Sequence, residues 1–331
     1  MKNVLVIGGT GFIGGHLVDN LCQNGFRVSA LVRENSDTKQ LESLGVKLLT
    51  GDLLDLDSLM KIISTVDTVF CLVNLKPIGK SQQEYEEELF KLHIDGTKNL
   101  VKTCRAKNVR SLVYLSSVAA IGYEKNVNVY DESSELHPKD SYGKAKLEAE
   151  NILNEASKDA KLDITILRPP GVFGERGLGA LSKIIKFVEK GVVPVLGNGK
   201  NRQSLTYVGN VINQIVWVAE NQNAAGKTYI VSDENPYSVN ELIDAVCKVA
   251  NKRALRIHIP VSLTMFGVII LNFIGRIILK REIMSKESII AISTERVFNG
   301  SKIFKELEYR QQYDLATSVK RTFDWHEKQN G

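Results

Sequence analysis

Near its amino terminus the chain reads Val4-Leu5-Val6-Ile7-Gly8-Gly9-Thr10-Gly11-Phe12-Ile13-Gly14-Gly15-His16. An apolar run, which predicts a buried strand, leads directly into glycines spaced G-x-x-G-x-x-G and then into a helix expected over Phe12–Cys22. In such a turn the first glycine allows a tight bend, the second lets backbone N–H groups approach a pyrophosphate, and the third lets the helix pack on the strand with its positive end toward the phosphates. The stretch predicts a dinucleotide-binding turn lined by Gly8, Thr10, Gly11, Phe12, Ile13 and Gly14.

The rest of the first half alternates short apolar runs with helical patterns or loops. Runs that are apolar on both faces are typical of buried parallel strands. Strand–helix alternation of this kind indicates an α/β fold with a Rossmann-type doubly wound parallel sheet. The predicted strands are Asn3–Ile7, Arg27–Val32, Val46–Thr50, Thr68–Leu72, Ser111–Ser116 and Asp163–Leu167.

The pattern changes after Arg168, where Pro169-Pro170-Gly171 interrupts the chain, glycines become frequent and helical patterns dominate. We therefore predict a dinucleotide-binding domain over residues 1–170 and a smaller, mostly helical C-terminal substrate lobe over residues 171–331. Parts of about 205–232 are expected to return to the first domain. The 331 residues, 43% of them hydrophobic and 24% charged, suffice for a sizeable core.

The end of the second predicted strand bears on the choice of cofactor. A carboxylate there usually accepts from the ribose 2′-hydroxyl of NAD, whereas a basic residue suits the 2′-phosphate of NADP. Arg33 occupies this place, so NADP is favoured; if Arg33 only stacks on the adenine, NAD fits equally well. Asp52, after the third strand, is placed to reach the adenine amino group.

A second group of residues carries acid–base chemistry. Tyr142 and Lys146 stand at i and i+4, so they share one face of a helix. A nearby ammonium stabilises a phenolate and lowers the pKa of the tyrosine, which makes Tyr142 a candidate general acid/base for a carbonyl or carbinol oxygen. Ser116 and Ser117 end the fifth strand, at the sheet edge where a serine hydroxyl can bond the same oxygen.

Together these motifs resemble the extended short-chain dehydrogenase/reductase family, which contains nucleotide-sugar epimerases and reductases. The resemblance covers nearly the whole chain. The motifs that carry it are Gly8-Gly9-Thr10-Gly11-Phe12-Ile13-Gly14, Gly51-Asp52-Leu53, Asp95-Gly96-Thr97-Lys98-Asn99-Leu100, Tyr114-Leu115-Ser116-Ser117, Tyr142-Gly143-Lys144-Ala145-Lys146 and Leu167-Arg168-Pro169-Pro170-Gly171-Val172-Phe173-Gly174.

The resemblance implies that Ser117, Tyr142 and Lys146 form a catalytic triad, with Lys146 also holding the nicotinamide ribose. It implies a homodimer through the two longest helices, about Gln82–Lys107 and Ser141–Ser157. The cofactor-binding residues expected beyond the glycine-rich turn are Arg33, Asp52, Leu53, Leu72, Val73, Ser116, Tyr142, Lys146, Pro169 and Val172.

The chain also departs from the family pattern. His93 stands where the family often has asparagine, and Val118-Ala119 follows the serine in place of the Asp-Glu pair of the 4,6-dehydratases. Gly171 replaces an asparagine that contacts the substrate diphosphate in many nucleotide-sugar members. In contrast, residues 197–211 are similar to a stretch of bacterial polysaccharide-cluster epimerases and 4-ketoreductases. The substrate-binding candidates there are Lys200, Arg202 and Tyr207.

These features favour NADPH-dependent reduction of a keto group on a nucleotide-sugar, with Tyr142 protonating the oxygen and Ser117 orienting it. Three alternatives stay open. The chain could be a 4-epimerase on a tightly held NAD, a reductase or dehydrogenase of a lipophilic steroid- or flavonoid-like ketone, or a non-catalytic NADPH-binding sensor.

The charge of the chain is concentrated in one place. Lys plus Arg total 43 and Asp plus Glu total 38, a net of +5, yet residues 248–286 hold eight basic residues against Glu282 alone. Residues 259–275 in the same stretch carry no charge. Basic residues around an apolar segment are consistent with three interpretations: a solvated helix of the lobe, an entry path for an anionic substrate, or a peripheral membrane contact through 259–281. No nucleic-acid partner is expected.

The four cysteines, Cys22, Cys71, Cys104 and Cys247, lie far apart in the sequence, with no CxxC motif and no histidine cluster. This spacing argues against a disulfide scaffold or a metal site and fits a cytoplasmic protein.

Overall fold

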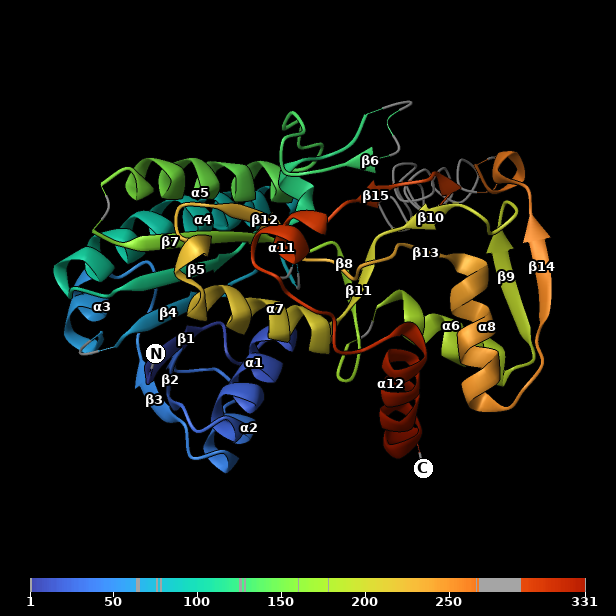
Figure 1. Cartoon of the computed structure of the whole chain (residues 1–331), viewed down its shortest axis with the longest axis horizontal. Coiled ribbons are helices and arrows are strands. Elements are labelled where there is room, and N and C mark those ends of the chain that lie inside the picture. Colours follow the sequence, from blue (N-terminus) through green and yellow to red (C-terminus); the bar gives the residue numbers. More distant parts are fainter. Residues whose placement is uncertain are drawn as a thin grey trace.

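A single parallel sheet organises most of the chain. The computed structural model describes residues 2–63, 66–75, 77, 79–124, 127, 129–159, 161–177, 179–265, 267 and 293–330. Seven strands form the sheet in the order β12-β7-β5-β4-β1-β2-β3, and every neighbouring pair is parallel (Figure 1). The strands are β1 (Asn3–Ile7), β2 (Arg27–Val32), β3 (Lys47–Thr50), β4 (Thr68–Cys71), β5 (Ser111–Leu115), β7 (Asp163–Arg168) and β12 (Thr228–Ile230).

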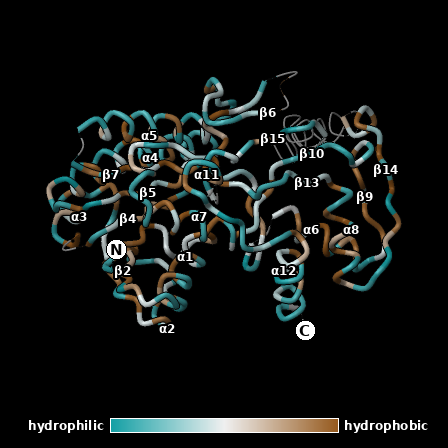
Figure 2. The backbone as a smooth tube through the Cα atoms, in the orientation of Figure 1, coloured by the Kyte–Doolittle hydropathy of each residue, from teal (hydrophilic) through white to brown (hydrophobic). Residues whose placement is uncertain are grey.

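Helices cover both faces of this sheet. Strand side chains alternate between the faces: Val4 and Val6 join the core under α1 (Phe12–Gln23) and α7 (Val208–Glu220). Leu5 and Ile7 join a second core on the opposite face. The helices over that second core are α3 (Leu56–Ile62), α4 (Gln82–Ala106) and α5 (Ser141–Ser157). Figure 2 shows the hydrophobic residues concentrated along these strands.

The predicted fold class, a doubly wound parallel α/β sheet, is confirmed. From β1 the chain builds outward through β2 and β3 and then crosses to β4 on the other side, so the order reverses between β1 and β4. In open α/β sheets ligands bind at such a switch point, outside the carboxyl ends of the strands. The edge strand β12 comes from residues 228–230, which lie beside β7 after the chain has left the sheet and returned.

The remaining large elements gather at the right of Figure 1, and we call them the C-terminal lobe. It contains a parallel two-stranded sheet, β9 with β14, and a short antiparallel pair, β10 with β13. Its elements are α6 (Ala180–Glu189), β9 (Val192–Leu196), β10 (Arg202–Gln203), β13 (Tyr237–Ser238), α8 (Val239–Ala250), β14 (Leu255–Ile259) and α12 (Leu315–Asn330).

Short elements connect the lobe to the large sheet. The strand β8 pairs in parallel with β11, and β6 pairs in parallel with β15. The bounds are α2 (Lys39–Ser43), η1 (Val118–Ala120), β6 (Val129–Tyr130), β8 (Gly171–Phe173), β11 (Leu205–Tyr207), η2 (Gln222–Ala224), β15 (Val297–Phe298) and α11 (Ser301–Glu306).

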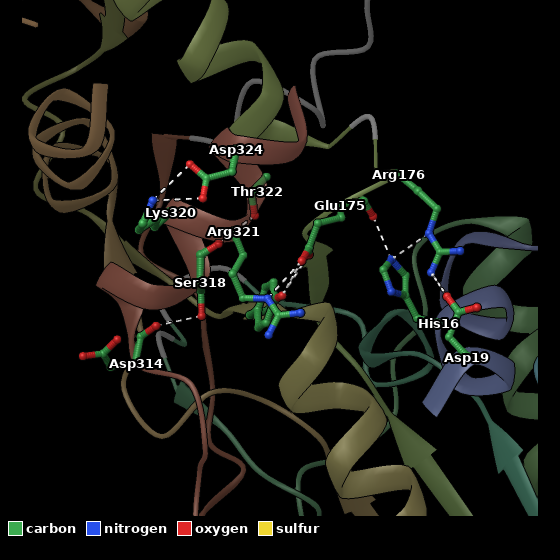
Figure 3. A network of polar contacts seen from close by, with 11 residues as sticks. His16, Asp19, Glu175, Arg176, Asp314, Ser318, Lys320, Arg321, Thr322 and Asp324 are labelled. Carbon is green, nitrogen blue, oxygen red and sulfur yellow. Dashed lines mark hydrogen bonds and ion pairs between the residues drawn. The ribbon is translucent and has the colours of Figure 1, made fainter. Parts of the chain in front are cut away.

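A polar network fastens the lobe to α1 through the loop after β8 (Figure 3). The Glu175 carboxylate accepts hydrogen bonds from the Tyr207 hydroxyl (2.8 Å) and from Arg321 Nε of α12 (3.1 Å). The Glu175 carbonyl oxygen lies 2.8 Å from Nε2 of His16 on α1. Arg176 adds an ion pair to Asp19, also on α1, at 2.7 Å. Adjacent residues of one loop therefore hold both parts of the molecule.

Most of the predicted membrane-contact stretch, 259–281, lies outside the described residues, as does most of the basic run 248–286. Within the part of the chain that the structure describes, no helix is long and apolar enough to cross a membrane.

Candidate active site

The glycine-rich turn has the shape that a bound pyrophosphate requires. Gly8 has φ +89°, a conformation that favours glycine, and a Cβ there would lie 2.8 Å from the carbonyl oxygen of Leu72. A Cβ at Gly14 would lie 2.1 Å from the carbonyl oxygen of Gly8, so only glycine lets α1 start this close to β1. Among the described residues no side chain caps the first turn of α1. Its N–H groups and the dipole are thus available to an anion, and the residues fit a dinucleotide.

The predicted cofactor residues on neighbouring strands lie along the same carboxyl edge of the sheet. Leu72 and Val73 directly follow β4, beside Gly8. Arg33 follows β2 with an exposed side chain, and its backbone N–H donates to the hydroxyl of Ser36 at 3.1 Å. Asp52 accepts from the N–H of Leu54 at 2.8 Å, which shapes the turn after β3.

The predicted triad comes together at the carboxyl end of β5. Ser117 follows the strand by two residues, and its hydroxyl accepts from the N–H of Ala119 at 3.1 Å and faces the phenol of Tyr142 closely enough to lower the pKa of that phenol. Tyr142 lies in the first turn of α5, whose N-cap, Asp140, accepts from the N–H of Gly143 at 2.7 Å. Lys146, one turn further along α5, is buried with Nζ 5.8 Å from the centre of the Tyr142 ring. The three side chains therefore meet between one side of α5 and the end of β5.

The pKa values differ from the simplest sequence argument. Burial raises the pKa of Tyr142 to about 12, although the Ser117 hydroxyl opposes this rise. Burial also lowers the pKa of Lys146 to about 8, opposed in part by the charge of Glu150. Burial therefore outweighs the lowering of the tyrosine pKa that the sequence argument expected from the lysine. Lys146 Nζ donates to the carbonyl oxygens of Leu115 (2.9 Å) and Val73 (3.2 Å).

A buried ion pair lies under the triad, and the sequence analysis missed it. Arg168, the last residue of β7, donates to both carboxylate oxygens of Glu150 (Nε to Oε1 is 3.0 Å), and the two side chains are 4% and 1% exposed. Ser116 also donates its hydroxyl to Glu150, so that hydroxyl points into the core. The signal was present, because Tyr142, Lys146 and Glu150 repeat every four residues along α5.

His93 also lies beside the triad. Its ring is fully buried, with Nδ1 3.0 Å from the Tyr114 hydroxyl and its centre 6.4 Å from that of Tyr142. Burial, and then the nearby charge of Lys146, lower the pKa of His93 to about 2, so the imidazole is neutral. Among the described residues its Nε2 has no hydrogen-bond partner. The place where relatives of this sequence type often have asparagine thus holds a neutral, packed imidazole.

With the turn and the triad side by side, the comparison with known families is direct. Residues 4–232 match the NAD dependent epimerase/dehydratase family. The chain belongs to this family. It is therefore an enzyme of an NAD-dependent oxidoreductase/epimerase family, as the resemblance to extended short-chain dehydrogenases predicted.

Two full-length relatives differ in what their names say they act on. The N-acetyl-α-D-glucosaminyl-diphospho-ditrans,octacis-undecaprenol 4-epimerase of Escherichia coli O157:H7 is 27% identical over 98% of this chain and 95% of its own length. The sterol-4-α-carboxylate 3-dehydrogenase of Candida albicans is 28% identical over 98% and 97%. A UDP-glucose 4-epimerase structure from Thermotoga maritima superposes with a TM-score of 0.77 over all of both chains at 20% identity, which shows the shared fold.

In this epimerase/dehydratase family member, the predicted substrate residues have different surroundings. Arg202 on β10 is half exposed and pairs with Glu241 of α8 at 3.4 Å, and Lys200 is exposed in the preceding loop. Tyr207 is 1% exposed and donates its hydroxyl to Glu175. The Tyr207 hydroxyl thus belongs to the inter-lobe network, and its contact with substrate stays a prediction. Pro169 accepts from the N–H of Val118, which holds the start of β8 against the turn after Ser117.

Proposed function

We propose that this enzyme epimerises C4 of a hexose that is carried on a polyprenyl diphosphate. The observation that carries the proposal is the placement of Tyr142 and buried Lys146 on one side of α5, at the end of β5 where Ser117 lies and near the glycine-rich turn. Support for the substrate class comes from the undecaprenyl-diphosphate sugar 4-epimerase, which aligns over nearly the full length of both chains.

The residues would act as follows. A bound nicotinamide supplies a hydride acceptor and donor at C4 of the sugar. Ser117 would bond the C4 oxygen and align it with the Tyr142 side-chain oxygen, which as the phenolate takes the proton when the carbinol becomes a ketone. As the phenol it then returns that proton when hydride comes back to the opposite face. The Lys146 ammonium stabilises the phenolate during this step. Hydride and proton are both returned, so no net oxidant is needed.

The exposed bases of the β9–β10 region would hold the diphosphate. Lys200 and Arg202 are exposed, and Arg202 has an exposed carboxylate partner, Glu241, that a diphosphate can displace.

The experiment is turnover of N-acetylglucosaminyl diphosphoundecaprenol in detergent by purified enzyme, followed by analysis of the released sugar. We expect a mixture of C4 epimers with no net change in nicotinamide absorbance. Stoichiometric consumption of NADPH would instead support the ketoreductase that the sequence favoured. UDP-N-acetylglucosamine serves as the control substrate, and its faster turnover would reject the lipid carrier.

A second candidate is oxidation of a ring hydroxyl on a sterol-like lipid. The Candida albicans relative aligns as completely as the epimerase, and the same serine, tyrosine and lysine suit a ring carbinol. Net reduction of NAD with a 3-hydroxysterol-4-carboxylate, and no sugar epimer in the first assay, would favour this activity.

The cofactor proposal is separate from the reaction. We propose that Arg33 gives a preference for NADP, because an exposed guanidinium stands at the end of β2 where NAD-specific sites carry a carboxylate. Arg33→Asp should move the ratio of NADP to NAD affinity toward NAD, measured by fluorescence titration. An unchanged ratio of NADP to NAD affinity would contradict the proposed role of Arg33.

We also propose a cytoplasmic homodimer built through α4 and α5, which pack against each other along the sheet. One side of α4 is exposed at Lys98 and Lys102, and in the proposed dimer a neighbouring subunit would cover this side. Sedimentation equilibrium of the purified enzyme tests this, and a monomer at all concentrations would reject it.

A further inference from the structure

The outer side of the β9–β14 sheet is apolar at every position. The strands pair in parallel with Leu255 opposite Val192 and Ile257 opposite Pro194. Successive side chains alternate between the two faces of a sheet. The outward-facing residues of the two strands, which we call the outer β9–β14 face, are Val192, Pro194, Leu196, Leu255, Ile257 and Ile259.

The inner side of the same sheet is an ordinary protein core. Val193 and Val195 are 2% and 0% exposed and pack with the residues of α6 and α8. Arg256, on the inner side of β14, reaches Asp244 of α8. The alternation is thus fixed by contacts, and it places the six apolar side chains on the side away from α6 and α8.

The exposure of these side chains is large for aliphatic residues. Leu255 is 66% exposed, Ile257 is 48% and Val192 is 39%. Leu263, in the helical residues that follow β14, is 60% exposed. Apolar residues scattered singly on a surface need no explanation, but a contiguous group on a regular face marks an interaction site. In Figure 1 β14 forms the outer edge of the C-terminal lobe, and in Figure 2 hydrophobic colour in β14 alternates with hydrophilic colour.

The charge around this face has one sign. Because the strands are parallel, their starts lie together, and exposed Lys190, Lys252 and Arg253 precede them. Neither residues 190–200 nor residues 251–265 contain an aspartate or a glutamate. A second copy of this face would bring the same positive charge and no counter-charge. An anionic lipid surface offers headgroups to the bases and an acyl boundary to the aliphatic side chains.

We propose that the outer β9–β14 face docks this enzyme on an anionic membrane. The proposal rests on the proposed function in one respect, that a polyprenyl diphosphate substrate resides in a membrane. The chain leaving β9 passes through Gly197 to Lys200 and Arg202, the proposed diphosphate residues. Docking through β9 and β14 would therefore bring these bases to the headgroup level, where a diphosphate lies.

Flotation with vesicles tests the docking directly. We expect the full-length enzyme to float with vesicles of phosphatidylglycerol and phosphatidylcholine, less at high salt, and weakly with phosphatidylcholine alone. The double variant Lys252→Gln/Arg253→Gln should lose about thirtyfold in partition coefficient. The double variant Leu255→Ser/Ile257→Ser should lose about tenfold or more.

Matched controls separate this face from general effects. Lys107→Gln/Arg110→Gln removes two exposed charges from the other end of the molecule, and Val129→Ser removes a 57% exposed aliphatic side chain from β6. Both should float like the wild type. Equal losses in these controls, or wild-type flotation of the Leu255→Ser/Ile257→Ser variant, would overturn the proposal.

Turnover in detergent distinguishes this proposal from the proposed function. If the membrane proposal fails alone, detergent-dispersed substrate is still epimerised and nothing floats. If only the function fails, the protein floats without epimerase activity. A concentration-dependent dimer that Leu255→Ser/Ile257→Ser abolishes, together with absent flotation, would assign the face to a second copy and reject the membrane.

Discussion

Two of the parallel sheets in the described residues meet their surroundings differently. The seven-stranded sheet has helices on both faces, and β4 and β5 are buried at every residue. The two-stranded β9–β14 sheet has α6 and α8 on one face, and aliphatic side chains exposed on the other. Parallel sheets are ordinarily covered on both faces, because their strands are apolar on both. Within the described residues the first sheet is thus complete, whereas the second keeps a face that another surface can cover.

The largest effect is expected at the carboxyl end of the covered sheet. Tyr142→Phe removes the hydroxyl that exchanges a proton with the substrate oxygen and should reduce kcat by about 10³-fold or more. Cofactor binding, which depends on the glycine-rich turn, should survive in a fluorescence titration. Tyr85→Phe, which changes a neighbouring phenol on α4, is the control and should keep most of the activity. Normal turnover by Tyr142→Phe would refute the assigned site.

The next effect compares two ion pairs in the two parts of the molecule. Glu150→Gln leaves the Arg168 guanidinium buried without its carboxylate and should cost about 3–5 kcal/mol of unfolding free energy. Glu241→Gln removes the Arg202 pair, whose side chains are 49% and 48% exposed, and should cost less than about 1 kcal/mol. Urea unfolding followed by circular dichroism measures both. Similar losses of unfolding free energy in the two variants would mean that burial does not determine how much an ion pair contributes to stability.

A third effect is the pH dependence of stability that buried His93, on a helix covering the seven-stranded sheet, should cause. The pKa of His93 is lowered from 6.5 to about 2 in the folded protein, so below pH 6.5 the unfolded chain binds the extra proton. The stability contributed by neutral His93 is complete above pH 6.5 and is lost as the pH falls. Between pH 6.5 and 4.5 the wild type should lose roughly 2–3 kcal/mol more than His93→Asn. Parallel pH curves from urea unfolding would contradict the burial of this ring.

The covered sheet was also the predictable part. The runs Asn3–Ile7 and Arg27–Val32 were predicted to the residue, because buried parallel strands are continuous apolar segments bounded by turns. The glycine-rich turn and the pairing of Tyr142 with Lys146 follow from spacing along single elements, which the sequence displays directly.

Contacts between distant elements were harder to predict. Glu150 meets Arg168 across 18 residues, and Tyr207 meets Glu175 across 32. Both depend on how α5, β7 and the loop after β8 pack, so neither contact can be read from the sequence. The β9 and β14 strands were overlooked because they lie about 60 residues apart in a region of helical patterns. Their partnership is visible only in the folded chain.

The smallest effect is expected on the uncovered face, and it tests the comparison itself. Leu112→Ala in β5 removes a fully buried side chain and should cost about 2–5 kcal/mol of unfolding free energy. Leu255→Ala in β14 makes the same chemical change at a side chain that is 66% exposed and should shift stability by less than about 0.5 kcal/mol. Anionic vesicles should increase the difference in stability between the wild type and Leu255→Ala. The reason is that a membrane surface that buries Leu255 stabilises the wild type more than the variant. Thermal unfolding with and without vesicles measures this, and a vesicle effect that is identical for the wild type and the Leu255→Ala variant would leave the outer β9–β14 face without its proposed partner.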